Sequence, residues 1–150
     1  MNKIVVGIDG LEGSRKALRW AFGEAQLRHV PLCVVHAWRA PRRVPGLVLH
    51  GAADAYPGDS GTVAATESRL ARDLIERELQ AIAAGKADVP IERRAAEGDP
   101  AKTLLEAAEG AELLVVGSSR NALERALLGD VARTCVSRAS CPVVVVPYGD

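Results

Sequence analysis

The sequence contains four short aliphatic runs with little polar interruption, and few architectures can accommodate them. They occupy residues 4–8, 32–38, 113–116 and 143–146. Runs of this length without polar alternation are typical of strands that are buried on both faces. Segments of helical period lie between them, including apolar stripes over 17–25, 70–82 and 101–108. Because strands and helices alternate, the sequence predicts parallel strands joined by right-handed crossovers, which is an open, doubly wound α/β sheet with helices on both faces.

The segment over 89–96 is a weaker strand candidate because it is polar and contains Pro90. Proline and charge discourage unwanted pairing, so this strand is expected at an edge of the sheet. A short helix is expected next, since Asp99 can cap its free amides, Pro100 suits its first position and Gly110 can end it. A charged run is interpreted as a solvated helix surface with ion pairs three and four residues apart: Arg69, Arg72, Asp73, Glu76, Arg77 and Glu78.

The 150 residues are expected to form one domain over 1–150 with a single core. Hydrophobic residues make up 48% and charged residues 25% of the chain, which argues against a disordered chain or a coiled-coil rod. A loop over about 39–62 contains three prolines and four glycines. A loop of this length is either disordered or draped over the surface, or it serves as a lid or partner contact, and the sequence leaves these alternatives open.

Charge and hydropathy exclude several kinds of partner. Nineteen basic and nineteen acidic side chains cancel, so we expect no binding to nucleic acid. No apolar stretch approaches the roughly 18 to 20 residues that cross a bilayer and no secretory signal is recognisable, so we expect no membrane contact and a cytoplasmic location. Cys33, Cys135 and Cys141 form no C-x-x-C pair and are expected as buried free thiols.

Ligands of open α/β sheets bind at the carboxyl ends of the strands, so the residues there are the candidates for a site. The first run leads into Asp9 and Gly10, and the fourth strand leads into the segment 117–120. Downstream, Gly129, Asp130 and Val131 precede a helix that is expected to end near residue 139. A glycine-rich turn that enters a helix N-terminus favours a phosphate, although the segment matches neither common phosphate-loop motif.

Six segments occur in a fixed order: I-V-V-G-I-D-G from Ile4, V-V-H-A-W from Val34, E-G-D-P-A from Glu97, A-E-L-L-V-V-G-S-S from Ala111, L-L-G-D-V-A from Leu127 and C-P-V-V-V-V-P from Cys141. This set resembles the universal stress protein family over nearly all of the chain outside the loop. The resemblance implies a five-stranded parallel sheet in the order 3-2-1-4-5 and a homodimer joined through the last strand, from Val143 to Pro147. It also implies that Asp9 and Ala37 hold the nucleoside of a bound nucleotide. Asp9 has a second interpretation as a turn residue before a helix that begins at Ser14.

In ATP-binding members of the family the phosphate loop reads G-x2-G-x9-G-[ST]. The resemblance therefore also assigns nucleotide binding to Val116, Gly117, Arg120, Gly129, Asp130 and Val131. The sequence departs from this pattern, because Arg120 replaces a glycine, the segment 121–128 is one residue short and Asp130 replaces the hydroxyl residue. A carboxylate at position 130 can cap the helix, but it repels a phosphate and cannot donate to it. Arg120, Arg125 or bound Mg²⁺ can compensate for that repulsion.

The sequence favours a non-enzymatic universal stress protein that acts in stress response or signalling and whose ATP binding is weakened or lost. One alternative is a protein that binds an adenine nucleotide, either ATP, AMP or a cyclic nucleotide, with or without Mg²⁺. A slow ATPase is the other alternative. No His-Asp-Ser order, metal-ligand spacing or carboxylate pair indicates catalysis, and His36 is expected to be a satisfied core residue.

Overall fold

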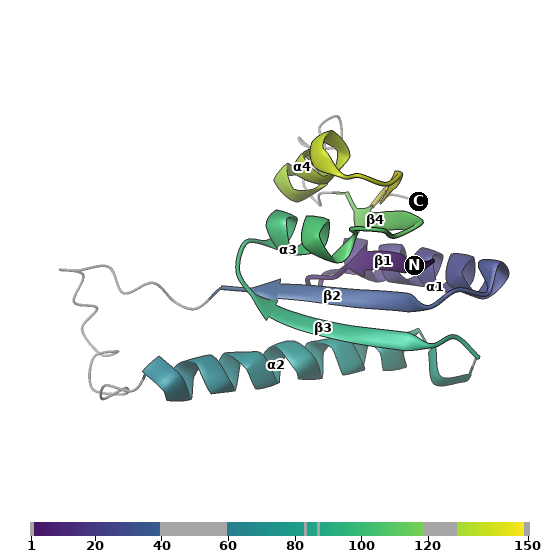
Figure 1. The fold of residues 1–150 in the computed structure, drawn as a ribbon. Helices are drawn as coiled ribbons and strands as arrows, with labels where there is room; N and C mark the ends of the chain where they lie inside the picture. Colours follow the sequence, from purple (N-terminus) through teal and green to yellow (C-terminus); the bar gives the residue numbers. More distant parts are fainter. Residues whose placement is uncertain (1, 40–59, 83, 87, 119–128, 149–150) are drawn as a thin grey trace.

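The computed structural model describes residues 2–39, 60–82, 84–86, 88–118 and 129–148. Its centre is a five-stranded parallel sheet in the order β3-β2-β1-β4-β5 (Figure 1). The strands are β1 (Ile4–Gly7), β2 (Leu32–Trp38), β3 (Ile91–Glu97), β4 (Leu113–Gly117) and β5 (Val143–Val146). The fold class and the strand order expected from the sequence are both confirmed, with the polar strand β3 at one edge.

Helices cover both faces of the sheet. They are α1 (Glu12–Arg28), α2 (Ser60–Ala81), α3 (Pro100–Ala107) and α4 (Asp130–Arg138), with the short 3-10 helix η1 (Ala84–Lys86) after α2. One core cluster joins Leu18 of α1 and Ile75 of α2 to Ile4 of the central strand. The other joins α3 and α4 to Val5. Since neighbouring residues of a strand face opposite ways, α1 and α2 lie on one face and α3 and α4 on the other (Figure 1).

Burial follows the position of each strand in the sheet. Ile4, Val5 and Val6 of the central strand are fully buried, as uninterrupted aliphatic runs predict. The expectation of burial on both faces is wrong for β5, whose four residues are only half-buried because this strand forms an edge. The carbonyls of Pro142 and Val146 accept hydrogen bonds from the β4 side, from Leu114 N and Ser118 N. In a parallel ladder the alternate residues Val143 and Val145 therefore direct their amides away from β4.

The helix signals are confirmed in α3 and shifted elsewhere. Asp99 is the N-cap of α3, and its carboxylate accepts from the amide of Lys102 at 3.0 Å. Gly110 has φ +71°, a left-handed conformation that suits glycine at a helix end. Helix α1 begins at Glu12, two residues before the expected start at Ser14. Ser14 lies in the first turn of the helix, and its hydroxyl accepts a hydrogen bond from the amide of Asp9 in the preceding turn. Helix α2 begins at Ser60, so the last residues of the expected loop are helical. Residues 40–59 of that loop, with its disordered, surface and lid alternatives, lie outside the described residues.

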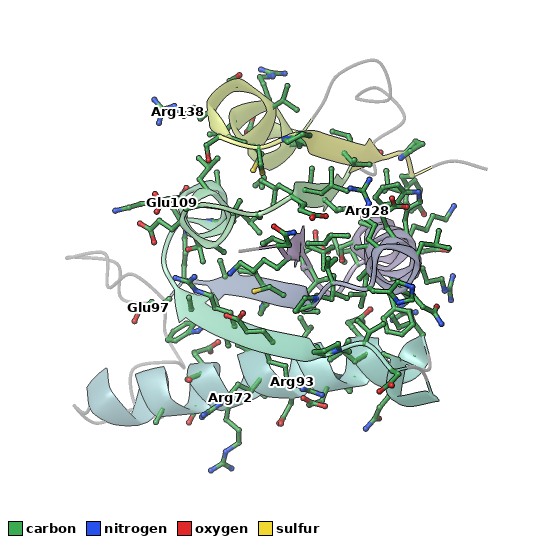
Figure 2. All side chains as sticks on the ribbon, turned by 45° about the vertical axis from the view of Figure 1, so that its right-hand side comes forward. Arg28, Arg72, Arg93, Glu97, Glu109 and Arg138 are labelled. Carbon is green, nitrogen blue, oxygen red and sulfur yellow. The ribbon has the colours of Figure 1, made fainter. Side chains whose placement is uncertain are left out.

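The charged surface of α2 differs from its expected form at two residues, Glu76 and Glu78. Arg72 of α2 and Arg138 of α4 project away from the sheet on opposite sides of the molecule (Figure 2). Glu78, however, is 4% exposed and was wrongly placed on the solvated surface. Its two carboxylate oxygens accept from Arg15 Nε at 2.9 Å and Arg15 Nη2 at 3.0 Å, which explains how a buried charge is tolerated and raises the pKa of Arg15 above its ordinary value. Glu76 pairs with Arg93 of β3, so both of these ion pairs join separate elements instead of residues within one helix.

The three cysteines are free thiols, as expected. Cys33 and Cys135 are buried, whereas Cys141 is only half-buried because it precedes the edge strand β5. Burial raises the pKa of the Cys33 thiol to about 11, which keeps it protonated and unreactive near neutral pH. None of the described helices is long and apolar enough to span a membrane.

Candidate functional site

A cavity of about 380 Å³ opens at the carboxyl ends of β1, β2 and β4. This volume lies in the lower part of the roughly 300–1,000 Å³ that small-molecule sites occupy. Five of the residues expected in the site line it: Asp9, Ala37, Val116, Gly117 and Val131. The sequence therefore located the crevice, since it is built from the strand ends that the switch in winding direction brings together.

Two more of the expected residues are described but lie outside the cavity lining. Gly129 and Asp130 are described, but neither lines the cavity. Gly129 is the N-cap of α4 and Asp130 is the exposed first residue of the helix, so the expectation that the Asp130 carboxylate caps α4 is wrong by one position. A negative charge in the first turn still favours the helix through its dipole. Arg120 lies outside the described residues.

Asp9 takes part in the turn between β1 and α1. Its Oδ1 accepts from the amide of Leu11 at 2.8 Å, and its own amide donates to the Ser14 hydroxyl at 3.1 Å. That hydroxyl donates in turn to the Leu11 carbonyl at 3.0 Å. Within the described part of the chain, no group donates to Asp9 Oδ2. The turn interpretation is confirmed, and the same carboxylate also has one oxygen left for a ligand in the cavity.

The wall between β4 and α1 is made of main chain. A Cβ added at Gly117 would lie 2.7 Å from the Gly13 carbonyl oxygen, and one added at Gly13 would lie 3.1 Å from the Ser118 carbonyl oxygen. No side chain fits between these segments. Gly117 was expected in the site as the first glycine of the family's phosphate loop, and the structure adds that it permits the first turn of α1 to contact the end of β4.

Two helices present their N-termini to the cavity without side-chain caps. The N-cap of α1 is Leu11 and that of α4 is Gly129, and neither makes a side-chain cap hydrogen bond. Gly13 and Val131, from the first turns of these helices, line the cavity. Free first-turn amides and the positive end of the helix dipole favour an acceptor-rich or anionic group nearby.

The sequence analysis missed an ion pair between residues that are close in sequence to Ala37 and Pro100, which line the cavity. Arg39 Nη2 is 2.5 Å from Asp99 Oδ1, and both side chains are exposed. The amide of Lys102 and the Arg39 guanidinium hold the pKa of the Asp99 carboxyl below its usual range. The strand register explains the contact, since Trp38 is opposite Glu97 and each charged residue follows its strand end closely. The Asp-Pro helix signal was visible in the sequence, but the partner of Asp99 was not.

His36 is a satisfied side chain, as expected. Its Nδ1 lies 2.8 Å from the Ile8 carbonyl oxygen, which accepts the ring proton. His36 is not among the residues that line the cavity. The described residues also contain no group of three or more His, Cys, Asp or Glu side chains arranged to hold a metal ion.

Ser118 was also not assigned to the site by the sequence analysis. It follows β4 directly and lines the cavity. Its hydroxyl accepts the amide proton of Tyr148 at 2.8 Å. The only sequence signal for Ser118 was its position after a glycine that ends a strand. That position alone does not indicate a binding residue, because the contact to Tyr148 is visible only in the structure.

The model of the Universal stress protein family matches residues 1–147. A universal stress protein of Mycobacterium tuberculosis is 33% identical over 149 residues, which cover 98% of this chain and 48% of that protein. The chain spans about half the length of the curated relatives it matches.

Solved structures share the architecture. The universal stress protein UspA from Lactobacillus plantarum has a TM-score of 0.71 at 20% identity, with 97% of each chain covered. A universal stress protein in complex with cAMP has a TM-score of 0.64 at 23% identity, covering 97% of this chain and 95% of that one. A family protein from Arabidopsis thaliana with AMP bound has a TM-score of 0.59 at 16% identity, covering 99% and 93%. At these identities the likeness supports the fold alone.

Proposed function

The chain belongs to the universal stress protein family, and we propose that it binds an adenine nucleoside or nucleoside monophosphate more tightly than ATP. In this proposal it acts in stress response or signalling in the cytoplasm, as a homodimer, without catalysing a reaction. The ligand class is the one named for two structural neighbours, which hold cAMP and AMP.

The observation that carries the proposal is the charge of the cavity. Asp9 is the only charged side chain among the described residues that line it. A second carboxylate, Asp130, stands at the start of α4, whose first-turn residue Val131 lines the cavity. Each additional phosphate adds negative charge to this environment, so a triphosphate is repelled more strongly than a monophosphate or a neutral nucleoside.

The strand order supports the orientation of such a ligand. Ala37, Asp9 and Gly117 stand at the ends of β2, β1 and β4, which are neighbours in the sheet. Adjacent strands are about 4.8 Å apart, so the β2 and β4 ends are separated by roughly 10 Å. In this arrangement the base lies near Ala37, the sugar near Asp9 and the phosphate near Gly117 and the free amides of α4. Because the described residues gather no metal-binding cluster, Mg²⁺ would enter with the phosphates of a nucleotide.

Calorimetric titrations with adenosine, AMP, cAMP and ATP, each with and without Mg²⁺, test the proposal. We expect AMP to bind at least tenfold more tightly than ATP. Wild-type protein that binds ATP as tightly as AMP would overturn the preference, and protein that binds none of the four ligands would overturn the function. Phosphate release from ATP that disappears in Asp9→Ala would instead favour the slow ATPase.

The variant Asp130→Asn tests the physical cause. Two unit charges 4 Å apart repel by about 1 kcal/mol in bulk water and about 4 kcal/mol at an effective dielectric constant of about 20. Because Asp130 is exposed, the lower figure applies, and we expect Asp130→Asn to tighten ATP binding about fivefold at low salt. Adenosine binding is the internal control, since it has no phosphate. A loss of the difference at high salt supports the electrostatic cause, whereas an unchanged ATP affinity at low salt contradicts it.

A further inference from the structure

Tyr148 connects the end of β5 to the first turns of α1. Its hydroxyl donates to Glu12 Oε2 at 3.3 Å, and Lys16 Nζ lies 5.8 Å from the centre of its ring. A Cβ added at Gly13 would lie 3.5 Å from a ring carbon of Tyr148, so the ring rests against the α1 backbone. These contacts hold the main chain of Tyr148 beside the cavity wall.

The Tyr148 amide fixes the hydroxyl of Ser118. It donates to Ser118 Oγ at 2.8 Å and so occupies one acceptor position of that oxygen. A serine hydroxyl also carries one proton that it can donate. No described residue accepts that proton, although Ser118 is half-buried and lines the cavity. The arrangement leaves an oriented donor that has no acceptor within the described protein.

The position of Ser118 decides which part of a ligand it can reach. Ser118 follows β4 and is thus separated from Ala37 of β2 by two strand spacings, or roughly 10 Å. Ser118 and Val131, a first-turn residue of α4, both line the cavity. Position 130, at the start of α4, has a carboxylate that only accepts when ionised.

We propose that the Ser118 hydroxyl donates a hydrogen bond to a phosphate oxygen of a bound nucleoside monophosphate, and that Tyr148 is the residue that positions it. This inference rests on the proposed function and names a phosphate-binding side chain for the same cavity. Ser118 supplies the neutral donor that position 130 lacks, and Tyr148 restricts the rotation of its hydroxyl.

The test compares AMP with adenosine by calorimetry on the full chain. We expect Ser118→Ala to weaken AMP binding about tenfold or more, as the loss of a hydrogen bond to a charged group does, and to leave adenosine binding within twofold of wild type. Ser118→Thr retains the hydroxyl and is expected to restore most of the AMP affinity. Tyr148→Ala, which removes the ring and its contacts to Glu12, Gly13 and Lys16 of α1, is expected to weaken AMP binding several-fold with adenosine again unchanged.

Each other result counts against the inference. Equal losses for AMP and adenosine in Ser118→Ala would assign Ser118 a structural role, and unchanged AMP binding would remove it from the site. Wild-type protein that binds adenosine but not AMP would overturn the phosphate contact and leave nucleoside binding in place. Wild-type protein that binds neither would overturn the proposed function itself, and this inference with it.

Discussion

Replacing Gly117 by alanine tests the close contact between β4 and the first turn of α1. An added Cβ would lie 2.7 Å from the carbonyl oxygen of Gly13, 2.8 Å from its carbonyl carbon and 3.1 Å from the amide nitrogen of Ser14. Favourable contacts between carbon atoms begin at about 3.5 Å, so the Gly13 carbon would have to move by roughly 0.7 Å. All three atoms belong to the main chain and cannot rotate away as a side chain can. We therefore expect a destabilisation of about 2 kcal/mol, within the range of roughly 1–3 kcal/mol for overpacking.

Chemical and thermal unfolding followed by circular dichroism measure this effect. For a chain of this size, a loss of about 2 kcal/mol corresponds to a melting temperature roughly 4–8 °C lower. The matched control is Gly23→Ala, which adds the same methyl group to α1 where nothing lies within 4 Å. Because glycine disfavours a helix interior, this control is expected to stabilise the protein by up to about 1 kcal/mol.

Comparing the two variants separates the effect of the contact with Gly13 from the general effect of replacing a glycine by alanine. If Gly117→Ala unfolds at the wild-type midpoint, the first turn of α1 does not contact β4 and this contact does not form the wall of the cavity. If Gly23→Ala destabilises the protein as much as Gly117→Ala does, the loss at position 117 cannot be attributed to the contact with Gly13.

Three further outcomes follow from the structure. Because burial raises the pKa of Cys33 to about 11, the folded state keeps a proton that the unfolded chain releases near pH 9. The free energy of unfolding, measured by chemical denaturation, should therefore fall between about pH 9 and pH 11. In Cys33→Ala the fall over this pH range should be less steep. Because the pKa of Asp99 is lowered, its contribution to the free energy of unfolding is present above about pH 4 and is lost as the pH falls through the lowered value. At pH 7, Asp99→Ala should be less stable than Asp99→Asn, since asparagine still caps α3. Equal stabilities of the two variants would exclude the cap as the cause. Sedimentation should show a dimer for wild-type protein and a monomer for Val145→Pro, which removes an amide directed away from β4, whereas a variant that stays dimeric would place the interface elsewhere.

The strands could be predicted from the sequence because burial on both faces leaves a local signal. The aliphatic runs identified all the inner strands, and a single proline with its charged neighbours placed β3 at an edge. The boundaries of α1 were less accessible. Leu11 carries no capping side chain, so the sequence gives no mark for a helix that begins at Glu12.

Contacts between distant residues account for what the sequence could not predict. Gly13 and Gly117 are separated by more than one hundred residues, and each has an ordinary local explanation as a glycine near a turn. Glu78 looks like any other charge on α2 until Arg15 is brought to it from α1. Within the site, Asp9 and Ala37 were found from strand ends and the family resemblance, whereas the role of Ser118 depends on where Tyr148 returns to the sheet.

The two edges of the sheet are chemically unlike. The β5 edge is a run of four valines, and the β3 edge carries Glu92, Arg93 and Arg94. If two copies pair along β5 about a twofold axis, both apolar margins are occupied at once and the charged margins become the outer limits of one continuous ten-stranded sheet. A further dimer could add to this sheet only by pairing two charged β3 edges. Self-association by strand pairing is therefore expected to stop at the dimer and not to extend into filaments.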